Sequence, residues 1–242
     1  MRILIISDIH ANMPALEAVL TAAGEVDATY CLGDIVGYGP DPNECIERLK
    51  SVPNLTCIMG NHDSAALGLI DIETFNKEAR QSARWTQKIL TADSRSFLTA
   101  LPETITSGNI TLAHGSPRNP IWEYVIDMRI ALINFSAYET RFCCIGHSHL
   151  PLAFLMSPNE KTLTWKLLSH DDQLSLEGRA MMNPGSVGQP RDHDQRAAYA
   201  IFDSEAFTWH AYRVEYDLKA IQKRIRAAGL PKHHADRLAE GW

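Results

Sequence analysis

The sequence predicts an α/β fold with a parallel β-sheet in its N-terminal part, and three observations support this prediction. Short strand-like runs alternate with helical stretches over the first 60 residues, as parallel strands require because each needs a crossover connection. The first of these runs is apolar throughout, which is typical of a strand covered on both faces. A chain of 242 residues with 45% apolar residues has the size and core-forming content of one sizeable α/β domain.

The N-terminal elements follow one another in β-α-β-α-β order. Residues 1–7 are a predicted strand, and Pro14 opens the helix after it. A second strand is predicted over 28–32, followed by a loop rich in glycine and proline and by a helix that Asn43 caps. The third strand, 54–59, completes a unit that implies a parallel sheet with right-handed crossovers.

The rest of the chain is predicted to contain a helical insertion and then mostly strands. Residues 64–101 show no strand pattern, and we expect two or three helices over one sheet edge, near the site described below. Asp217 caps a last helix with a solvated basic face, and His233 and His234 are expected to be exposed in a polar tail. We predict further strands at 104–106, 110–113, 141–145, 152–156, 162–168 and 180–182, a helix around 127–137, and a closing hairpin of 197–202 with 208–214. Since no linker or repeat interrupts these elements, we expect a single domain over residues 1–242.

Composition limits the classes of protein that this chain can belong to. The net charge of −6 argues against broad binding of nucleic acids, although it is compatible with a local positive site. No apolar run has the length of a membrane span. Five cysteines are an odd number without CxxC spacing, and three of them, Cys31, Cys57 and Cys143, lie in apolar runs as buried free thiols. We therefore expect a protein of the reducing cytoplasm, with no membrane partner.

Metal-ligating side chains follow five of the predicted strands. Ligands bind at the carboxyl ends of strands in an open α/β sheet. The clusters are Asp8-x-His10, Gly33-Asp34, Gly60-Asn61-His62-Asp63, His114, and His147-x-His149. A spacing of two on an extended chain places both side chains on one side, which predicts that Asp8 lies beside His10 and His147 beside His149. One such cluster alone is compatible with a polar turn, but five at the ends of strands in one sheet indicate a metal site.

The types of ligand limit the metal chemistry. No thiolate is present in the clusters, which excludes a cysteine zinc site and an iron–sulfur centre. Imidazole with carboxylate and one amide suits Mn, Fe, Zn, Ni or Co. Seven candidate ligands are too many for one ion and enough for two divalent ions with a bridging carboxylate. Because two aspartates do not neutralise two such ions, the site would attract anions, as two-metal phosphoryl chemistry requires. The candidate ligands are Asp8, His10, Asp34, Asn61, His114, His147 and His149.

In this order the five motifs resemble those of the calcineurin-like metallophosphoesterase superfamily. A later run, Asn183-Pro184-Gly185-Ser186-Val187-Gly188-Gln189-Pro190-Arg191, is similar to its small prokaryotic phosphodiesterase branch. The resemblance implies a four-layer αββα sandwich, in which two mixed β-sheets pack face to face and are flanked by helices. It also implies that a metal-bridging hydroxide attacks phosphorus and that His62 donates a proton to the leaving oxygen. The implied ligands are Asp8, His10, Asp34 and His149 for one ion, and Asp34, Asn61, His114 and His147 for the other.

Two positions depart from the superfamily pattern. Tyr38 stands where protein phosphatases and symmetrical dinucleoside tetraphosphatases carry a phosphate-binding arginine, and Gly37 stands where protein phosphatases carry an aspartate that orients the catalytic histidine. Another group must therefore orient His62. Asn12, Tyr38, Arg118 and Arg191 are candidates for contact with the substrate from their sequence positions, although for each arginine the pattern favours a place on the surface.

The sequence thus predicts a dinuclear metal-dependent hydrolase of phosphodiesters or small phosphorylated molecules. A nucleotidase or dinucleoside polyphosphate hydrolase without the usual arginine is the alternative enzyme. A binding scaffold, the role of the retromer subunit in this superfamily, is the alternative from another class; loss of ligands would favour it, and none is lost. The partner we expect is a phosphorylated small molecule rather than a nucleic acid, and a homo-oligomer is left open.

Overall fold

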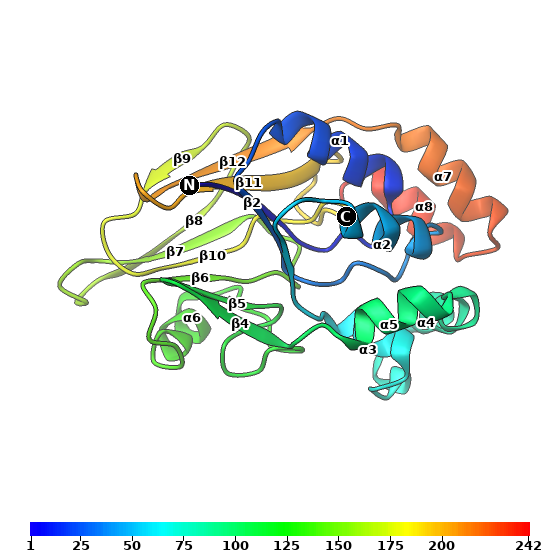
Figure 1. Ribbon diagram of the computed structural model, residues 1–242, viewed down its shortest axis with the longest axis horizontal. Coiled ribbons are helices and arrows are strands. Elements are labelled where there is room, and N and C mark those ends of the chain that lie inside the picture. Colours follow the sequence, from blue (N-terminus) through cyan, green and yellow to red (C-terminus); the bar gives the residue numbers. More distant parts are fainter.

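The computed structural model describes all residues, 1–242, and contains two β-sheets at the middle of the molecule (Figure 1). Sheet A has the strand order β3 (Leu55–Cys57), β2 (Ala28–Cys31), β1 (Arg2–Ile6), β11 (Ala197–Asp203), β12 (Thr208–Val214) and β9 (Gln173–Ser175). Strands β1, β2 and β3 are parallel, and β11 pairs antiparallel with β1. The parallel unit and the closing hairpin of β11 and β12 are therefore confirmed. Strand β9 was not predicted, because it has only three residues and two of them are exposed.

Sheet B has the strand order β4 (Thr104–Ser107), β5 (Ile110–Ala113), β6 (Phe142–Cys144), β10 (Ala180–Met182), β7 (Leu152–Met156) and β8 (Leu163–Leu167). The three central strands, β5, β6 and β10, are parallel. The outer strands β4, β7 and β8 run antiparallel to their neighbours. Both sheets are therefore mixed, as the resemblance implied.

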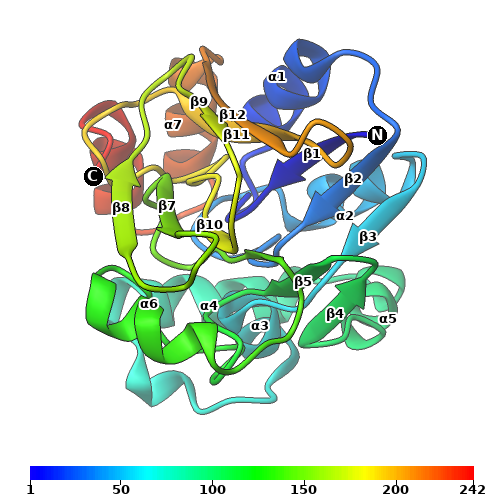
Figure 2. The same cartoon turned by 90° about the vertical axis from the view of Figure 1, so that its left-hand side faces the viewer.

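The helices complete a four-layer arrangement (Figures 1 and 2). They are α1 (Met13–Ala23), α2 (Pro42–Lys50), α3 (Asn61–Leu67), α4 (Lys77–Ile89), α5 (Ala92–Thr99), α6 (Met128–Phe135), α7 (Leu218–Ala227) and α8 (Lys232–Asp236), with short 3₁₀ turns at Ile72–Thr74 and Arg237–Ala239. None of these helices combines the length and apolar character needed to cross a bilayer.

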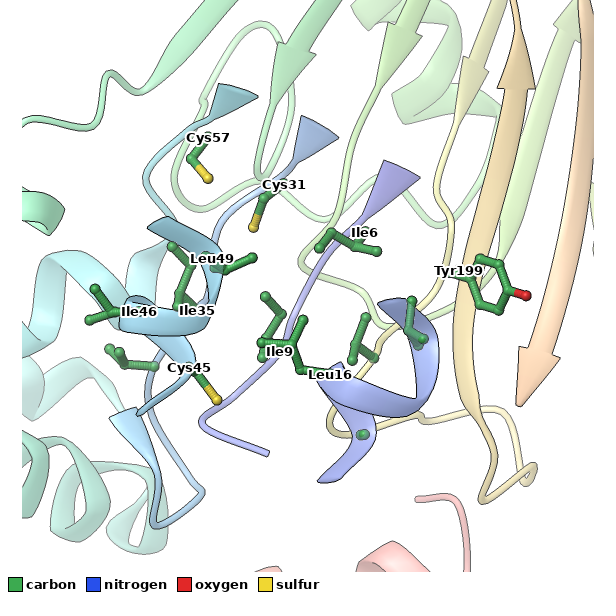
Figure 3. Packing of buried hydrophobic residues seen from close by; sticks show 14 of the residues in the cluster. Ile6, Ile9, Leu16, Cys31, Ile35, Cys45, Ile46, Leu49, Cys57 and Tyr199 are labelled. Carbon is green, nitrogen blue, oxygen red and sulfur yellow. The ribbon is translucent and has the colours of Figure 1, made fainter. Parts of the chain in front are cut away.

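Three apolar clusters define the layers. Between the two sheets, Ile5 of β1 and Leu32, which follows β2, pack with Phe142 and Met182 of sheet B. On the other face of sheet A, residues of α1 and α2 pack on the strands; Figure 3 shows Leu16, Ile46 and Leu49 beside Ile6, Cys31 and Cys57. On the outer face of sheet B, Phe135 of α6 packs with Phe154. Each sheet thus has apolar packing on both faces, which confirms the predicted αββα sandwich. All five cysteines are buried and free.

Two local predictions need correction. Helix α2 begins at Pro42 with Asp41 at the cap position, because the fixed φ of proline suits the first helical turn. Asn43 instead bonds the carbonyl of Ile89 and the N–H of Thr91, which ties α2 to the junction between α4 and α5. The insertion does contain three helices, but the first of them, α3, begins at Asn61, three residues before the predicted start of the insertion.

Candidate metal centre

The candidate ligands lie at the carboxyl ends of strands from both sheets. Asp8 and His10 follow β1, Asp34 follows β2, and Asn61 begins α3 after β3. The remaining three ligands, His114, His147 and His149, follow β5 and β6 of sheet B. The expectation of a single sheet is therefore wrong: because the sheets pack face to face, the ends of their parallel strands meet at one end of the sandwich.

The loops that carry these ligands are not extended. Five of the candidate ligands adopt positive φ angles between 49° and 64°: Asp8, His10, Asp34, His147 and His149. Each such residue costs on the order of 1–3 kcal/mol, so the surrounding fold must hold it in place, and such strain clusters at functional sites. The prediction that His147 lies beside His149 on one side of an extended chain is wrong, since the two side chains join different groups of ligands.

The ligand atoms form two groups that share one carboxylate. The first group is Asp8, His10, Asp34 and His149, and the second is Asp34, His114 and His147; within each, the ligand atoms lie within 4.8 Å of one another. The Nε2 atoms of His10 and His149 are 3.1 Å apart. Nε2 of His114 lies 3.3 Å from Oδ2 of Asp34 and 3.1 Å from Oδ1 of Asn61. Asn61 therefore lies with the second group, and Asp34 is placed between the two.

Main-chain carbonyls orient three of the imidazoles. Nδ1 of His10 lies 3.2 Å from the carbonyl of Val36, Nδ1 of His114 2.8 Å from that of Leu32, and Nδ1 of His149 2.5 Å from that of Gln189. A carbonyl only accepts, so each Nδ1 carries the hydrogen and each Nε2 faces the neighbouring ligands. This second contact is what metal-binding histidines in proteins almost always make.

The site is buried and highly charged. Burial opposes the charge on the His114 imidazole, but the carboxylates of Asp34 and Asp8 raise its pKa to about 10. Burial and the positive charge of His114 lower the pKa of His147 to about 3. Burial favours protonation of Asp34, but His114 and His62 hold the pKa of its carboxyl well below the usual range. A divalent ion bound in the second group would have to displace the proton of His114, since metal ligands bind deprotonated.

The residues present fit two metal ions. Oδ1 of Asp8 and Nε2 of His147 are buried without any hydrogen-bond partner, and such atoms are rare in folded proteins unless they serve a ligand. A mixed set of imidazole nitrogens with carboxylate and amide oxygens suits divalent transition metals. The centre therefore has the donor types, convergence and shared carboxylate of a dinuclear site.

The loop at residues 183–191 holds the ligand loops in place through hydrogen bonds. Nδ2 of Asn183 donates to the carbonyl of Gly146 at 2.6 Å, and Oγ of Ser186 donates to the carbonyl of Asp8 at 2.8 Å. A Cβ at Gly188 would lie 1.8 Å from the carbonyl oxygen of Ile9, so only glycine fits there. In the sequence, this run was notable for its likeness to one branch of the superfamily. The contacts of the loop with Gly146 and Asp8 depend on the tertiary fold and could not be predicted from the sequence.

His62 lies against three aromatic rings beside the centre. Its ring centroid is 4.4 Å from that of Tyr38, 4.8 Å from that of Phe75 and 5.0 Å from that of His10. Its main-chain N–H donates to Oδ1 of Asp34 at 2.8 Å, while its Nδ1 is buried without a partner. Burial lowers the pKa of His62 to about 4. Packing against rings therefore orients this imidazole in place of a carboxylate, and a Cβ at Gly37 would lie only 2.6 Å from Nδ1.

The four candidates for substrate contact differ in their surroundings. Asn12 caps α1 by accepting from the N–H of Ala15 and donates to the carbonyl of Gly188, so its side chain has partners inside the protein. Arg118 forms an ion pair with Glu123 at 2.7 Å and is half exposed. Tyr38 packs on His10 and His62, and Nη2 of Arg191 lies 3.5 Å from the Tyr38 hydroxyl. The structure thus brings Tyr38 and Arg191 together at the centre.

The C-terminal segment also reaches the centre, which the sequence did not predict. His234 is 2% exposed rather than solvated, and its ring lies 4.9 Å from that of Tyr38. Its Nε2 lies 3.2 Å from the carbonyl of Glu78, which links α8 to α4. The polar residues around His233-His234 concealed this contact, because no apolar periodicity in the tail marks a buried face.

Comparison with known proteins places the fold and the motifs in one family. The profile of the calcineurin-like phosphoesterase superfamily domain matches residues 1–206. The chain is 37% identical to the uncharacterized protein MJ0912 of Methanocaldococcus jannaschii, over 99% of this chain and 98% of that one. The crystal structure of a metallophosphoesterase from Sphaerobacter thermophilus superposes with a TM-score of 0.91 at 45% identity, covering 100% of this chain and 99% of that one.

The crystal structure of the hypothetical protein PH1004 from Pyrococcus horikoshii superposes with a TM-score of 0.82 at 24% identity. The superposition covers 100% of this chain and 98% of that one, and it shows that the two proteins share a fold. The profile match spans most of the chain and every candidate ligand, and the ligands converge as the motifs predict. The chain therefore belongs to the calcineurin-like phosphoesterase superfamily.

Proposed function

We propose that this protein is a dinuclear metal-dependent phosphoesterase that hydrolyses phosphodiesters or small phosphorylated molecules. The observation that supports this most is the pair of ligand groups that share Asp34. A shared carboxylate keeps two ions close enough to act on one phosphate. The five buried free cysteines support an enzyme of the reducing cytoplasm.

Seven side chains would hold the two ions. Asp8, His10, Asp34 and His149 are the ligands we propose for one, and Asp34, Asn61, His114 and His147 for the other. Bound ions of Mn, Fe, Zn, Ni or Co would supply positive charge and Lewis acidity at the phosphoryl group. The protein contributes the fixed orientation of the imidazoles, since the carbonyls of Val36, Leu32 and Gln189 hold three of them in place.

His62 is the residue that we propose donates to the leaving oxygen. It is not a member of either ligand group, yet it follows the ligand Asn61 directly and packs on the ligand His10. Donation of a proton requires the imidazolium form of His62. Burial lowers the pKa of this ring to about 4, so a negatively charged phosphate bound beside it would have to stabilise the protonated form. Contact with Tyr38 and Phe75 would hold the ring in that position.

The alternative enzyme, a nucleotidase or dinucleoside polyphosphate hydrolase, gains support from Arg191. The superfamily arginine is replaced by Tyr38, but the guanidinium of Arg191 reaches the Tyr38 hydroxyl from a distant loop. A silent scaffold is disfavoured, because all seven ligands and His62 are retained and converge.

The test is hydrolysis of bis-p-nitrophenyl phosphate and p-nitrophenyl phosphate by metal-stripped protein after Mn, Fe, Zn, Ni, Co or Mg is added back. Asp34→Asn should lose bound metal and activity, because it weakens both groups. His62→Ala should keep two ions per chain and lose most of the hydrolysis of both substrates. Arg84→Gln, a change of an exposed ion pair on α4, is the control. Absence of bound metal under all conditions would contradict the proposal and favour the scaffold.

A further inference from the structure

The outer face of sheet B carries a group of exposed apolar side chains. Eleven large apolar side chains of this chain are exposed, and more than half of them lie on α6, on the segment just before it and on β8. Single apolar residues on a surface are ordinary, so it is the gathering of these residues that needs an explanation. The members of this group, which we call the α6–β8 patch, are Ile126, Met128, Leu132, Ile133, Trp165 and Leu167.

Helix α6 is apolar on both of its faces. Ala131 and Phe135 are buried in the cluster on the outer face of sheet B. On the opposite side, Met128 and Leu132 are exposed and four residues apart, so they lie one above the other, and the exposed Ile133 follows them. A helix on the surface of a protein has a polar outer face, whereas a helix that is apolar all round is buried. The outer side of α6 therefore has the composition of a covered surface.

Strand β8 continues this apolar surface at the edge of sheet B. Helix α6 and β8 are in contact, at the same side of the molecule (Figure 2). Trp165 pairs with Phe154 and Leu167 pairs with Leu152, and both partners belong to the apolar cluster under α6. Because paired residues of two strands lie on the same face of a sheet, Trp165 and Leu167 face the α6 side. Strand β8 is also the last strand of sheet B, so its outer edge is open to a further strand.

The size of the patch fits an interface between two folded chains. Its six side chains are each about half exposed, which amounts to roughly 500 Å² of apolar surface, near the upper end of what a monomer exposes. About 65% of a homodimer interface is apolar, so roughly 500 Å² of apolar surface corresponds to about 800 Å² per subunit. This is the area that each partner of a stable interface contributes.

The charges and the strand edge favour a second copy of this chain as the partner. Asp127 and Arg129 are exposed beside the patch, and Arg129 is the only charged residue within α6. Neither forms an ion pair within the chain, whereas Lys166 of β8 pairs with Asp172. A two-fold interface uses the same surface of both copies, so it offers Asp127 of each copy to Arg129 of the other. The same symmetry allows β8 to pair antiparallel with its own copy.

We propose that the α6–β8 patch is the interface of a homodimer with two-fold symmetry. Strand β8 of one copy runs antiparallel to β8 of the other, which joins the two copies of sheet B and brings the outer sides of the two α6 helices together. The patch contains none of the candidate metal ligands, so this inference does not rest on the proposed function.

Sedimentation equilibrium of the full chain at micromolar concentrations tests the interface. Wild-type protein should have twice the mass of the 27.0 kDa chain. Leu132→Glu and Trp165→Glu should each raise the dissociation constant of the dimer at least about 30-fold, because a carboxylate would be buried among apolar side chains. Leu69→Glu is the matched control: Leu69 is 63% exposed and lies outside the patch, so this variant should remain a dimer.

A wild-type monomer at these concentrations would overturn the inference and leave the patch to a different protein or to no partner. A dimer that persists in both patch variants, or that Leu69→Glu also dissociates, would overturn it as well. Cooperative urea unfolding of each variant shows that a lost dimer is not a lost fold. Hydrolysis of p-nitrophenyl phosphate separates this outcome from failure of the proposed function: an active wild-type monomer would refute the dimer alone. A dimer that both patch variants dissociate, but that is inactive with every metal, would refute the hydrolase alone.

Discussion

Lowering the pH from 8 to 5 should weaken this fold through the buried imidazole of His234. This side chain is 2% exposed, donates from Nε2 to the carbonyl of Glu78 at 3.2 Å, and has no partner at Nδ1. Burial is the main reason that its pKa falls to about 4; the positive charges of Arg237 and His233 act in the same direction, while Glu78 acts against them. Its remaining charged or titratable neighbour is Tyr38, whose ring it contacts.

The sign and size of the effect follow from the two pKa values. In the unfolded chain the pKa of His234 returns to about 6.5, so the unfolded state takes up a proton at a higher pH than the folded state. The stabilising contribution is therefore complete above pH 6.5 and is lost as the pH falls toward 4. Between pH 8 and pH 5 the free energy of unfolding should drop by about 2 kcal/mol through this residue.

Urea unfolding at pH 8 and pH 5 measures this loss in metal-free wild-type protein, in His234→Gln and in His233→Gln. The other buried histidines titrate alike in all three proteins. A difference between two proteins in the loss of unfolding free energy therefore comes from the substituted histidine alone. His234→Gln keeps a donor for the Glu78 carbonyl and should lose about 2 kcal/mol less than the wild type between the two pH values. His233→Gln removes an exposed imidazole from the same helix as a control. An equal loss in wild type and His234→Gln would refute the reasoning.

Three further changes test the site and the packing. Gly37→Ala places a Cβ about 2.6 Å from Nδ1 of His62 at a φ of +91°, so hydrolysis should fall by roughly 100-fold while elemental analysis still finds two ions per chain. Phe154→Ala opens a cavity in the fully buried contact between sheet B and α6 and should cost about 3–5 kcal/mol in urea unfolding. Asp217→Ala removes the acceptor for the N–H of Ala220, 2.9 Å away at the start of α7, and should cost about 1 kcal/mol, whereas Asp217→Asn should cost less.

Each of these predictions has an outcome that contradicts it. Full activity in Gly37→Ala would show that His62 moves freely or takes no part in the reaction. Loss of metal in that variant would show instead that the strain spreads to the ligands. A cost below about 1 kcal/mol for Phe154→Ala would mean that α6 does not pack tightly on sheet B. Equal stability of the Asp217→Ala and wild-type proteins would mean that the cap contributes nothing to α7.

The sequence by itself determined the class of fold and the identity of the candidate ligands. Apolar runs such as that of β1, each ending in a polar residue, are local patterns, and they specify strands and the sheet edge where side chains gather. The alternation of β1, α1, β2, α2 and β3 is also local, and it requires a parallel sheet. Histidine, aspartate and asparagine at these strand ends are chemically suited to divalent metals wherever the chain places them.

The tertiary structure decided how those residues are divided and what surrounds them. His147 and His149 are two residues apart, yet they belong to different ligand groups, because left-handed backbone at both positions turns their side chains apart. Spacing on an extended chain cannot predict this, since other segments hold the strained loops in place. The loop of Asn183 and Ser186 and the burial of His234 depend likewise on contacts between distant parts of the chain. Arg191 and Tyr38 are 153 positions apart in the sequence, and only the packing of the loop at residues 183–191 brings Nη2 of Arg191 to 3.5 Å from the Tyr38 hydroxyl.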